Sequence, residues 1–181
     1  MKILAINGSH RKGNTEAMLK KILDGARENG AMIELVNLRD RKIEVCKSCM
    51  GCENTGSCRI QDDFPHIFEK LARADIVVLG SPNYFNNVTA VMKNFIDRMN
   101  AHWQDERLKG KKVVLAMPGG QGKESREAGM QAFEQFPKIC KMQVIEKMTE
   151  QLDLPQEAQK NEEIMQKCFE LGERLAGQKI P

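Results

Sequence analysis

The chain has 181 residues and a net charge of +3, from 28 basic and 25 acidic side chains. This length suits one domain with a full core, and so small a charge excess argues against nucleic acid or a membrane surface as a partner. No apolar run reaches the roughly 18 residues of a membrane span, and Asn7 interrupts the apolar start too early for a secretory signal, so we expect a cytoplasmic protein with reduced thiols.

Apolar runs alternate with helical patterns along the chain. Five runs rich in Val, Ile and Leu are expected as strands: 2–6, 32–38, 75–80, 111–117 and 142–149. Five segments with apolar residues at helical spacing are expected as helices: 15–28, 62–71, 88–99, 125–136 and 161–176. Strands buried on both faces and separated by helices indicate a parallel sheet. The pattern predicts an α/β fold with a doubly wound five-stranded sheet of order 2-1-3-4-5, in one domain spanning 1–181.

The turn from Gly8 to Thr15 joins the first expected strand to the first helix. A glycine-rich turn that opens a helix directs backbone N–H groups and the positive end of the helix dipole at one spot. The pattern favours a phosphate site, although a helix capped by Asn14 or Thr15 is the simpler alternative. The residues predicted to bind the phosphate are Ser9, Arg11, Lys12, Gly13, Asn14 and Thr15.

The residues of the turn also argue against several classes of phosphate-containing ligand. A nucleoside triphosphate loop would have a lysine after its second glycine, where Asn14 stands. The dinucleotide fingerprint is absent, and the turn has no cysteine that could serve as a phosphatase nucleophile. A strand–turn–helix that holds one terminal phosphate remains, which is how flavodoxin-like folds bind FMN.

Two more loops follow strands at the same edge of the predicted sheet. The loop 81–87 places two adjacent aromatics at a strand end, which suits a flat ring system unless they merely cover the core. The loop 118–122 is rich in glycine, which lets backbone approach a ligand closely. The candidate ligand-binding residues of these two loops are Pro82, Asn83, Tyr84, Phe85, Asn86, Gly119, Gly120 and Gln121.

Four of the six cysteines fall in an insertion at about 43–61, after the second expected strand: Cys46, Cys49, Cys52 and Cys58. The first three have the C-x₂-C-x₂-C spacing of bacterial ferredoxins, which favours a [4Fe–4S] cluster. Structural zinc usually uses two C-x₂-C pairs with a longer linker. Zinc and metal-free thiols remain as alternatives.

The phosphate turn, the four cysteines and the segments 81–85 and 93–98 together resemble the iron–sulfur flavoproteins of the NADPH-dependent FMN reductase superfamily. The resemblance covers residues 1–125 and, more loosely, the rest. It implies a flavodoxin-like fold, bound FMN, a [4Fe–4S] cluster on the four cysteines, and a homodimer or homotetramer. It also implies electron transfer from ferredoxin or NAD(P)H to a small quinone-like or oxygen-derived acceptor.

Two positions depart from that family pattern. His10 stands where the family usually has proline, and Asn83 where it usually has an apolar residue. Trp103 is expected either to roof a flavin of a neighbouring subunit or to pack at an interface, and Cys140 and Cys168 are expected in the core. The alternatives are a cluster-free NAD(P)H-dependent FMN, quinone or azo reductase, and a flavodoxin-like electron carrier that is not an enzyme.

Overall fold

The computed structural model describes residues 1–177 and contains a five-stranded parallel sheet of order β2-β1-β3-β4-β5, as predicted. The strands are β1 (Lys2–Asn7), β2 (Met32–Asn37), β3 (Ile76–Gly80), β4 (Lys112–Ala116) and β5 (Gln143–Met148). Every residue of β3 is buried, because this central strand is covered on both faces.

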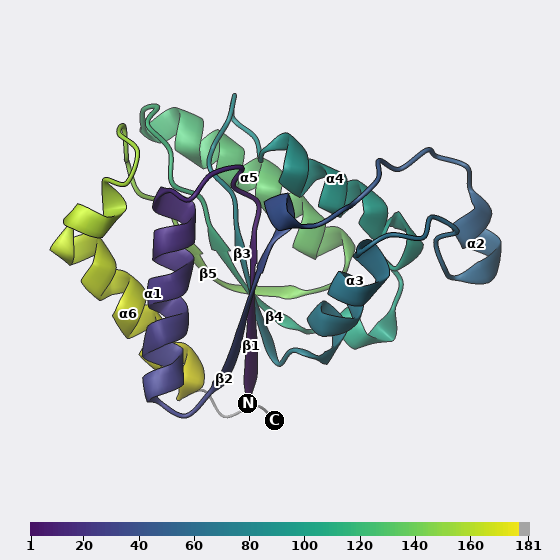
Figure 1. The fold of residues 1–181 in the computed structure, drawn as a ribbon, viewed down its shortest axis with the longest axis horizontal. Helices are drawn as coiled ribbons and strands as arrows, with labels where there is room; N and C mark the ends of the chain where they lie inside the picture. The colour runs from purple at the N-terminus through teal and green to yellow at the C-terminus, as the bar shows by residue number, and fades with distance from the viewer. Residues whose placement is uncertain (178–181) are drawn as a thin grey trace.

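Helices form a layer on each face of the sheet (Figure 1). One layer holds α1 (Asn14–Glu28) and α6 (Glu162–Ala176), and the other holds α3 (Phe64–Arg73), α4 (Ala90–Arg98) and α5 (Lys123–Ile139). The remaining helical segments are short: η1 (Leu38–Asp40), α2 (Gly51–Thr55), η2 (Met99–Ala101), η3 (Glu106–Leu108) and η4 (Ala158–Lys160). No helix within residues 1–177 has the length and apolar character needed to cross a membrane.

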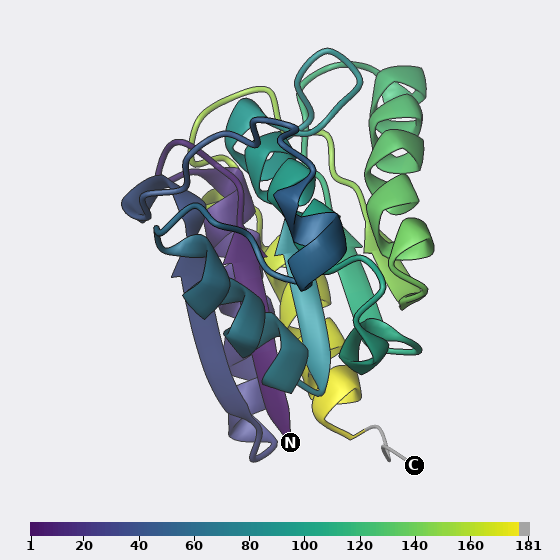
Figure 2. The ribbon, with the colours of Figure 1, turned by 90° about the vertical axis from the view of Figure 1, so that its right-hand side faces the viewer.

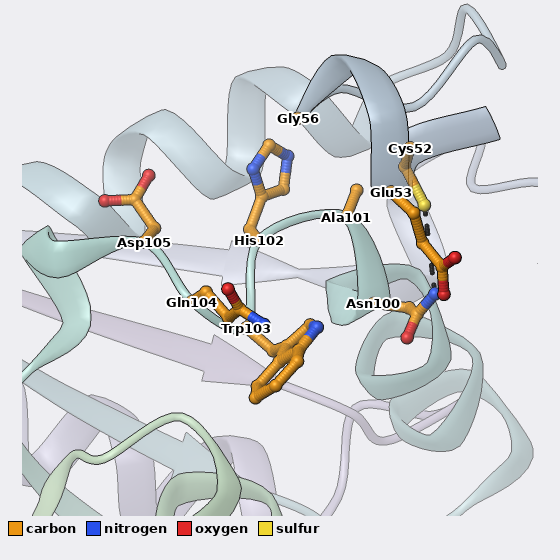
Figure 3. Close-up of a pocket in the computed structure, with 9 residues that line it drawn as sticks. All are labelled: Cys52, Glu53, Gly56, Asn100, Ala101, His102, Trp103, Gln104 and Asp105. Atoms are coloured by element: carbon orange, nitrogen blue, oxygen red, sulfur yellow. Dashed lines mark hydrogen bonds between the residues drawn. The ribbon is translucent and has the colours of Figure 1, made fainter. Parts of the chain in front are cut away.

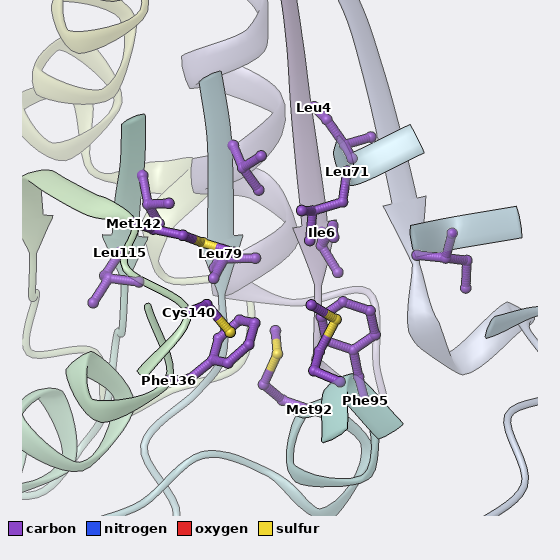
Figure 4. Close-up of a cluster of buried hydrophobic side chains, with 14 of the residues drawn as sticks. Leu4, Ile6, Leu71, Leu79, Met92, Phe95, Leu115, Phe136, Cys140 and Met142 are labelled. Atoms are coloured by element: carbon purple, nitrogen blue, oxygen red, sulfur yellow. The ribbon is translucent and has the colours of Figure 1, made fainter. Parts of the chain in front are cut away.

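The core is divided in two by the sheet, because successive residues of a strand point to opposite faces. Ile3 and Ala5 of β1 pack in the cluster under α1 and α6. Leu4 and Ile6 pack in the cluster under the other three helices, which Figure 4 shows with Phe95 of α4 nearby.

Helices α1 and α6 lie unusually close together, because each has a glycine at the contact. A Cβ on Gly25 would lie 2.1 Å from the carbonyl oxygen of Phe169, and one on Gly172 would lie 2.0 Å from that of Ile22. Neither position has room for a side chain, so the two glycines allow α1 and α6 to pack closely against each other.

The cysteine insertion leaves the sheet after β2 and passes over the outer side of the α3–α4 layer. Figure 1 shows its short helix α2 beyond α3 and α4, and Figure 2 shows α2 in front of that layer. Two of its residues that are not glycine, Ser48 and Met50, have positive φ angles of 47° and 57°. The insertion is therefore an irregular segment that packs on helices rather than on the sheet.

Candidate functional site

A pocket lies at the carboxyl edge of the sheet, where the loops after β1, β3, β4 and β5 meet. It is lined by Ser9, Arg11, Asn14, Thr15, Pro82, Asn83, Tyr84, Pro118, Gly119, Gly120, Leu152 and Asp153. Since β1 and β3 are neighbours whose connections run to opposite faces, this is the switch point at which doubly wound sheets bind ligands.

The first loop is fixed to the neighbouring strand and helix. The backbone N–H of Gly8 donates to the carbonyl oxygen of Gly80 at 2.7 Å. The hydroxyl of Thr89 donates to the carbonyl of Gly8 and also caps α4 by accepting from the N–H of Met92 at 3.2 Å. A Cβ on Gly8 would lie 2.7 Å from Cβ of Met92, so the loop needs glycine here.

The turn then folds around the buried side chain of Ser9. Its Oγ donates to the carbonyl oxygen of Arg11 at 2.9 Å and accepts from the N–H of Arg11 at 3.3 Å. Arg11 lines the pocket, and its guanidinium forms no ion pair within residues 1–177. It is thus a cation available to a ligand.

Helix α1 begins without a side-chain cap. Its N-cap residue is Gly13, and no side chain accepts a hydrogen bond from the first turn. The simpler interpretation of the turn, a helix capped by Asn14 or Thr15, is therefore wrong. The uncapped N–H groups and Arg11 instead give the features of an anion site.

A second cation near the turn is already neutralised. Arg39 forms an ion pair with the buried Glu16 at 2.7 Å and donates to the carbonyl oxygen of Arg11 at 3.4 Å. Burial alone would raise the pKa of Glu16, but its bonds to Lys20 and Arg39 more than reverse this and lower it. Glu16 is therefore ionised near neutral pH, and Arg39 supports the turn while Arg11 keeps its charge for the pocket.

The side chain of Asn14 has a contact that the sequence did not reveal. Its Nδ2 donates to the carbonyl oxygen of Leu154 at 2.9 Å, and its Oδ1 accepts from the N–H of Ala158 at 3.1 Å. The amide thus ties the segment after β5 to α1 and brings Leu152 and Asp153 into the pocket. These two residues were missed, although the position of the fifth strand in the sheet already places its following loop at this edge.

The second loop ends in a tight turn. Tyr84 and Asn87 exchange two backbone hydrogen bonds of 2.9 and 3.0 Å, with Phe85 and Asn86 at the tip in positive φ. Tyr84 lines the pocket, whereas Phe85 is 95% exposed and points away from the protein. Of the two adjacent aromatics, only Tyr84 is placed to contact a ligand in the pocket.

The second and third loops are joined through Asn83. Its N–H donates to the carbonyl oxygen of Pro118 at 2.9 Å, and its Nδ2 donates to Oγ of Ser125 at 2.9 Å. A Cβ on Gly119 would lie 2.8 Å from Cβ of Asn83, so glycine permits this close packing. Ser125 also contacts Asn86 and Gln121.

The structure therefore brings most of the predicted flavin residues into one pocket but leaves some outside. Those that do not line it are Lys12, Gly13, Phe85, Asn86 and Gln121. Asn86 and Gln121 support the loops through Ser125, and Gly13 is the N-cap of α1.

The four clustered cysteines are free thiols, two exposed and two partly buried. In the part of the chain that the structure describes, no three side chains of the metal-binding types are gathered closely enough to hold a metal ion. The pKa of the Cys49 thiol is lowered, mainly by the backbone N–H of Gly51, with a contribution from Arg59. Since thiolates are the form that binds metals, the donor types suit a cluster, while their present positions do not surround one centre.

A second pocket lies between α2 and the segment that follows α4 (Figure 3). It is lined by Cys52, Glu53, Gly56, Asn100, Ala101, His102, Trp103, Gln104 and Asp105, and it shares no residue with the first pocket. Nδ2 of Asn100 donates to Sγ of Cys52 at 3.8 Å, which the dashed line in Figure 3 marks.

Two side chains of this second pocket have aromatic character. The ring of His102 stacks on Phe68 at 3.7 Å between centroids, and burial lowers the pKa of His102. Trp103 is 41% exposed and also borders an apolar groove with Phe136 and Ile139. The prediction that Trp103 lies at an interface or over a flavin stays a prediction.

The two cysteines outside the run lie in the core, as expected. Cys140 is the C-cap residue of α5 and Cys168 is a buried residue of α6, and each belongs to the core cluster on its own face of the sheet. Burial raises their thiol pKa values to about 11 and about 12 respectively, so both stay protonated near neutral pH.

Comparisons with known proteins agree with this geometry. The family described as NADPH-dependent FMN reductase matches residues 1–152. An iron–sulfur flavoprotein of Archaeoglobus fulgidus is 44% identical over 98 residues, which are 54% of this chain and 48% of that protein. The match thus spans about half of that relative.

Two further similarities extend over more of the chain. An iron–sulfur flavoprotein of Methanocaldococcus jannaschii is 32% identical over 146 residues, or 80% of this chain and 76% of that protein. The solved structure of a flavodoxin from an archaeon superposes with a TM-score of 0.63 at 17% identity, covering 97% of this chain and 96% of the other. That structure shows the fold alone, which is flavodoxin-like. The family match and the relatives show that the chain belongs to the NADPH-dependent FMN reductase family of oxidoreductases and, within it, to the iron–sulfur flavoproteins.

Proposed function

We propose that the chain binds FMN in the pocket at the carboxyl edge of the sheet and exchanges electrons between this flavin and a [4Fe–4S] cluster on Cys46, Cys49, Cys52 and Cys58. The observation that carries the flavin part is the uncapped first turn of α1 beside the free guanidinium of Arg11. Together they offer backbone donors and one full positive charge to a phosphate.

The remaining pocket residues suit the ring end of FMN. Tyr84 offers an aromatic face, and Gly119 and Gly120, which have no side chains, let the backbone approach the ring edge closely. The N–H of Gly119 donates to the carbonyl oxygen of Glu150 at 3.0 Å, which holds this loop in place. The bound flavin supplies one- and two-electron chemistry and the cluster supplies one-electron chemistry, while the protein orients them and tunes their surroundings.

Ferredoxin or NAD(P)H is the proposed electron donor, and a small quinone-like or oxygen-derived molecule is the proposed acceptor, in the cytoplasm. The protein is proposed to act as a homodimer or homotetramer. The exposed side chains of Trp103 and Ile139, beside an apolar groove, support self-association.

A second candidate is a cluster-free NAD(P)H-dependent FMN reductase. The observation in its favour is that the described residues gather no metal-binding group. In that case the four thiols would be redundant or redox-sensing, and FMN would react directly with a nicotinamide and an acceptor.

Anaerobic purification separates the two candidates. FMN, iron, acid-labile sulfide and zinc are measured per chain, together with the visible spectrum. We expect one FMN and about four irons with four sulfides, as four cysteine ligands imply. FMN without iron supports the cluster-free reductase, and zinc without sulfide refutes the cluster.

A further inference from the structure

The two ends of the cysteine insertion are hydrogen-bonded to each other. The N–H of Lys42 donates to Oδ2 of Asp63 at 2.8 Å, and the N–H of Asp63 donates to the carbonyl oxygen of Lys42 at 3.0 Å. Nearer to the cysteines, the N–H of Glu44 donates to Oδ2 of Asp62 at 2.9 Å. The four clustered cysteines therefore lie on a loop whose base is closed.

A side chain from α4 completes this closure. Arg98 forms an ion pair with Asp62 through Nη1 and donates through Nη2 to Oδ1 of the same carboxylate at 3.2 Å. Nη1 also donates to the carbonyl oxygen of Glu44 at 2.9 Å. One guanidinium thus contacts both ends of the insertion and connects them to a helix of the core.

This ion pair is wholly buried. The side chains of Arg98 and Asp62 are each 0% exposed, and the guanidinium lies 4.8 Å from the centroid of the Phe64 ring. Desolvation of two charges is costly, and well-packed apolar residues in place of a buried ion pair often stabilise a protein equally well or better. Fold stability alone is therefore a weak reason for a charge pair at this position.

Nε of Arg98 is buried and has no hydrogen-bond partner within residues 1–177. The hydrogen bonds that the guanidinium does form, to Asp62 and to Glu44, join the two ends of the insertion.

We propose that Arg98, paired with Asp62, is a positioning residue that holds the ends of the cysteine insertion together and so favours assembly of an iron–sulfur cluster on its thiols. This inference rests on the proposed function. A closed loop base restricts the conformations that four ligands must lose when they gather round a cluster.

The test uses variants in which neither Arg98 nor Asp62 is left as a buried charge without its partner. The double variant Arg98→Met with Asp62→Leu removes both members of the ion pair. Arg98→Lys keeps the positive charge but loses the bidentate contact with the Asp62 carboxylate. The control is Lys93→Met with Asp97→Leu, which removes an exposed ion pair of the same helix. Each protein is purified anaerobically, and its FMN content, its iron and sulfide, the rate of iron loss to a chelator and the Tm are measured.

The buried double variant should keep its FMN but bind the cluster roughly 10–100-fold more weakly, as loss of a supporting contact around a metal site typically does. Arg98→Lys should recover part of this retention, because it keeps a charge beside Asp62 but cannot form all the contacts of the guanidinium. The exposed double variant should retain its cluster as the wild type does.

The outcomes separate this inference from the proposed function. Wild-type protein without iron and sulfide would refute the proposed function before any variant is made. A buried double variant with wild-type iron retention would refute the role of Arg98 and leave the function intact. Loss of FMN and a collapsed Tm in Arg98→Lys as well would show that the pair supports the whole fold, which also overturns the positioning role.

Discussion

At the scale of single residues, the charge of Arg11 is the feature of the flavin pocket that is easiest to test. We expect Arg11→Ala to lose a charge-assisted contact of about 1.5–3 kcal/mol, and FMN affinity should therefore fall at least about tenfold. Lys12→Ala is the control, because Lys12 does not line the pocket and should matter much less. FMN fluorescence titration measures both, and wild-type affinity in Arg11→Ala would remove Arg11 from the site.

Asn100 gives a second prediction at this scale. Its amide donates to Sγ of Cys52, and hydrogen bonds to cluster sulfurs raise the reduction potential because they stabilise the added negative charge. Asn100→Leu removes the donor at similar size and should lower the midpoint potential of the proposed cluster. Gln104→Leu removes an amide from the same pocket and should leave the potential unchanged. An EPR-monitored redox titration measures the midpoint potential of each variant. Equal shifts of this potential in the two variants would contradict the specific role of Asn100.

At the scale of elements, the contact between α1 and α6 predicts a stability effect. Gly172→Ala would place a methyl group 2.0 Å from the carbonyl oxygen of Ile22, so the two helices must move apart. Such overpacking typically costs about 1–3 kcal/mol, and the Tm should fall by several degrees. Gly177→Ala, where a Cβ has its nearest neighbour at 3.6 Å, should have a much smaller effect. Thermal unfolding of both variants checks this, and an unchanged Tm for Gly172→Ala would contradict the close packing.

The elements themselves could be predicted from the sequence, and the contacts between loops could not. The three inner strands β1, β3 and β4 follow from short runs of Val, Ile and Leu, because a strand covered on both faces must be apolar throughout. The edge strands β2 and β5 contain charged residues, and the strand order follows from the doubly wound pattern that alternating strands and helices indicate. The tertiary contacts of Asn14 with Leu154 and Ala158 leave no such periodic signal. The orientation of Phe85 could not be predicted either. Its aromatic side chain indicated a ligand contact, but the geometry of the turn directs this side chain into solvent.

At the scale of the whole molecule, the flavin pocket and the cysteine insertion occupy different places. The insertion leaves the same edge of the sheet as the flavin loops, as its position after β2 predicts, but α2 comes to lie over the α3–α4 layer (Figure 2). The pocket beside Cys52 shares no lining residue with the flavin pocket. Loss of the cluster should therefore leave the flavin site of the same chain intact.

Replacing Cys52 tests whether electrons pass through the cluster. Cys52→Ala removes one proposed iron ligand, so the cluster should be lost or impaired, while FMN should still bind because its loops follow β1, β3, β4 and β5. Reduction of the flavin by a one-electron donor such as ferredoxin should then become much slower. Direct hydride reduction by NAD(P)H, and turnover of an acceptor by chemically reduced flavin, should be largely retained.

The measurement is a pair of reduction assays on wild type, Cys52→Ala and the control Cys140→Ala, all reconstituted with FMN. Cys140 is the buried C-cap residue of α5, outside the insertion, so its variant should behave as the wild type in both assays. Equal ferredoxin-driven rates in all three proteins would show that electrons bypass the cluster. If both routes fail in Cys52→Ala while FMN stays bound, the insertion supports the flavin site or a subunit interface, since a one-electron relay alone would leave hydride transfer unaffected. Selective loss of the ferredoxin route is the result that a relay requires.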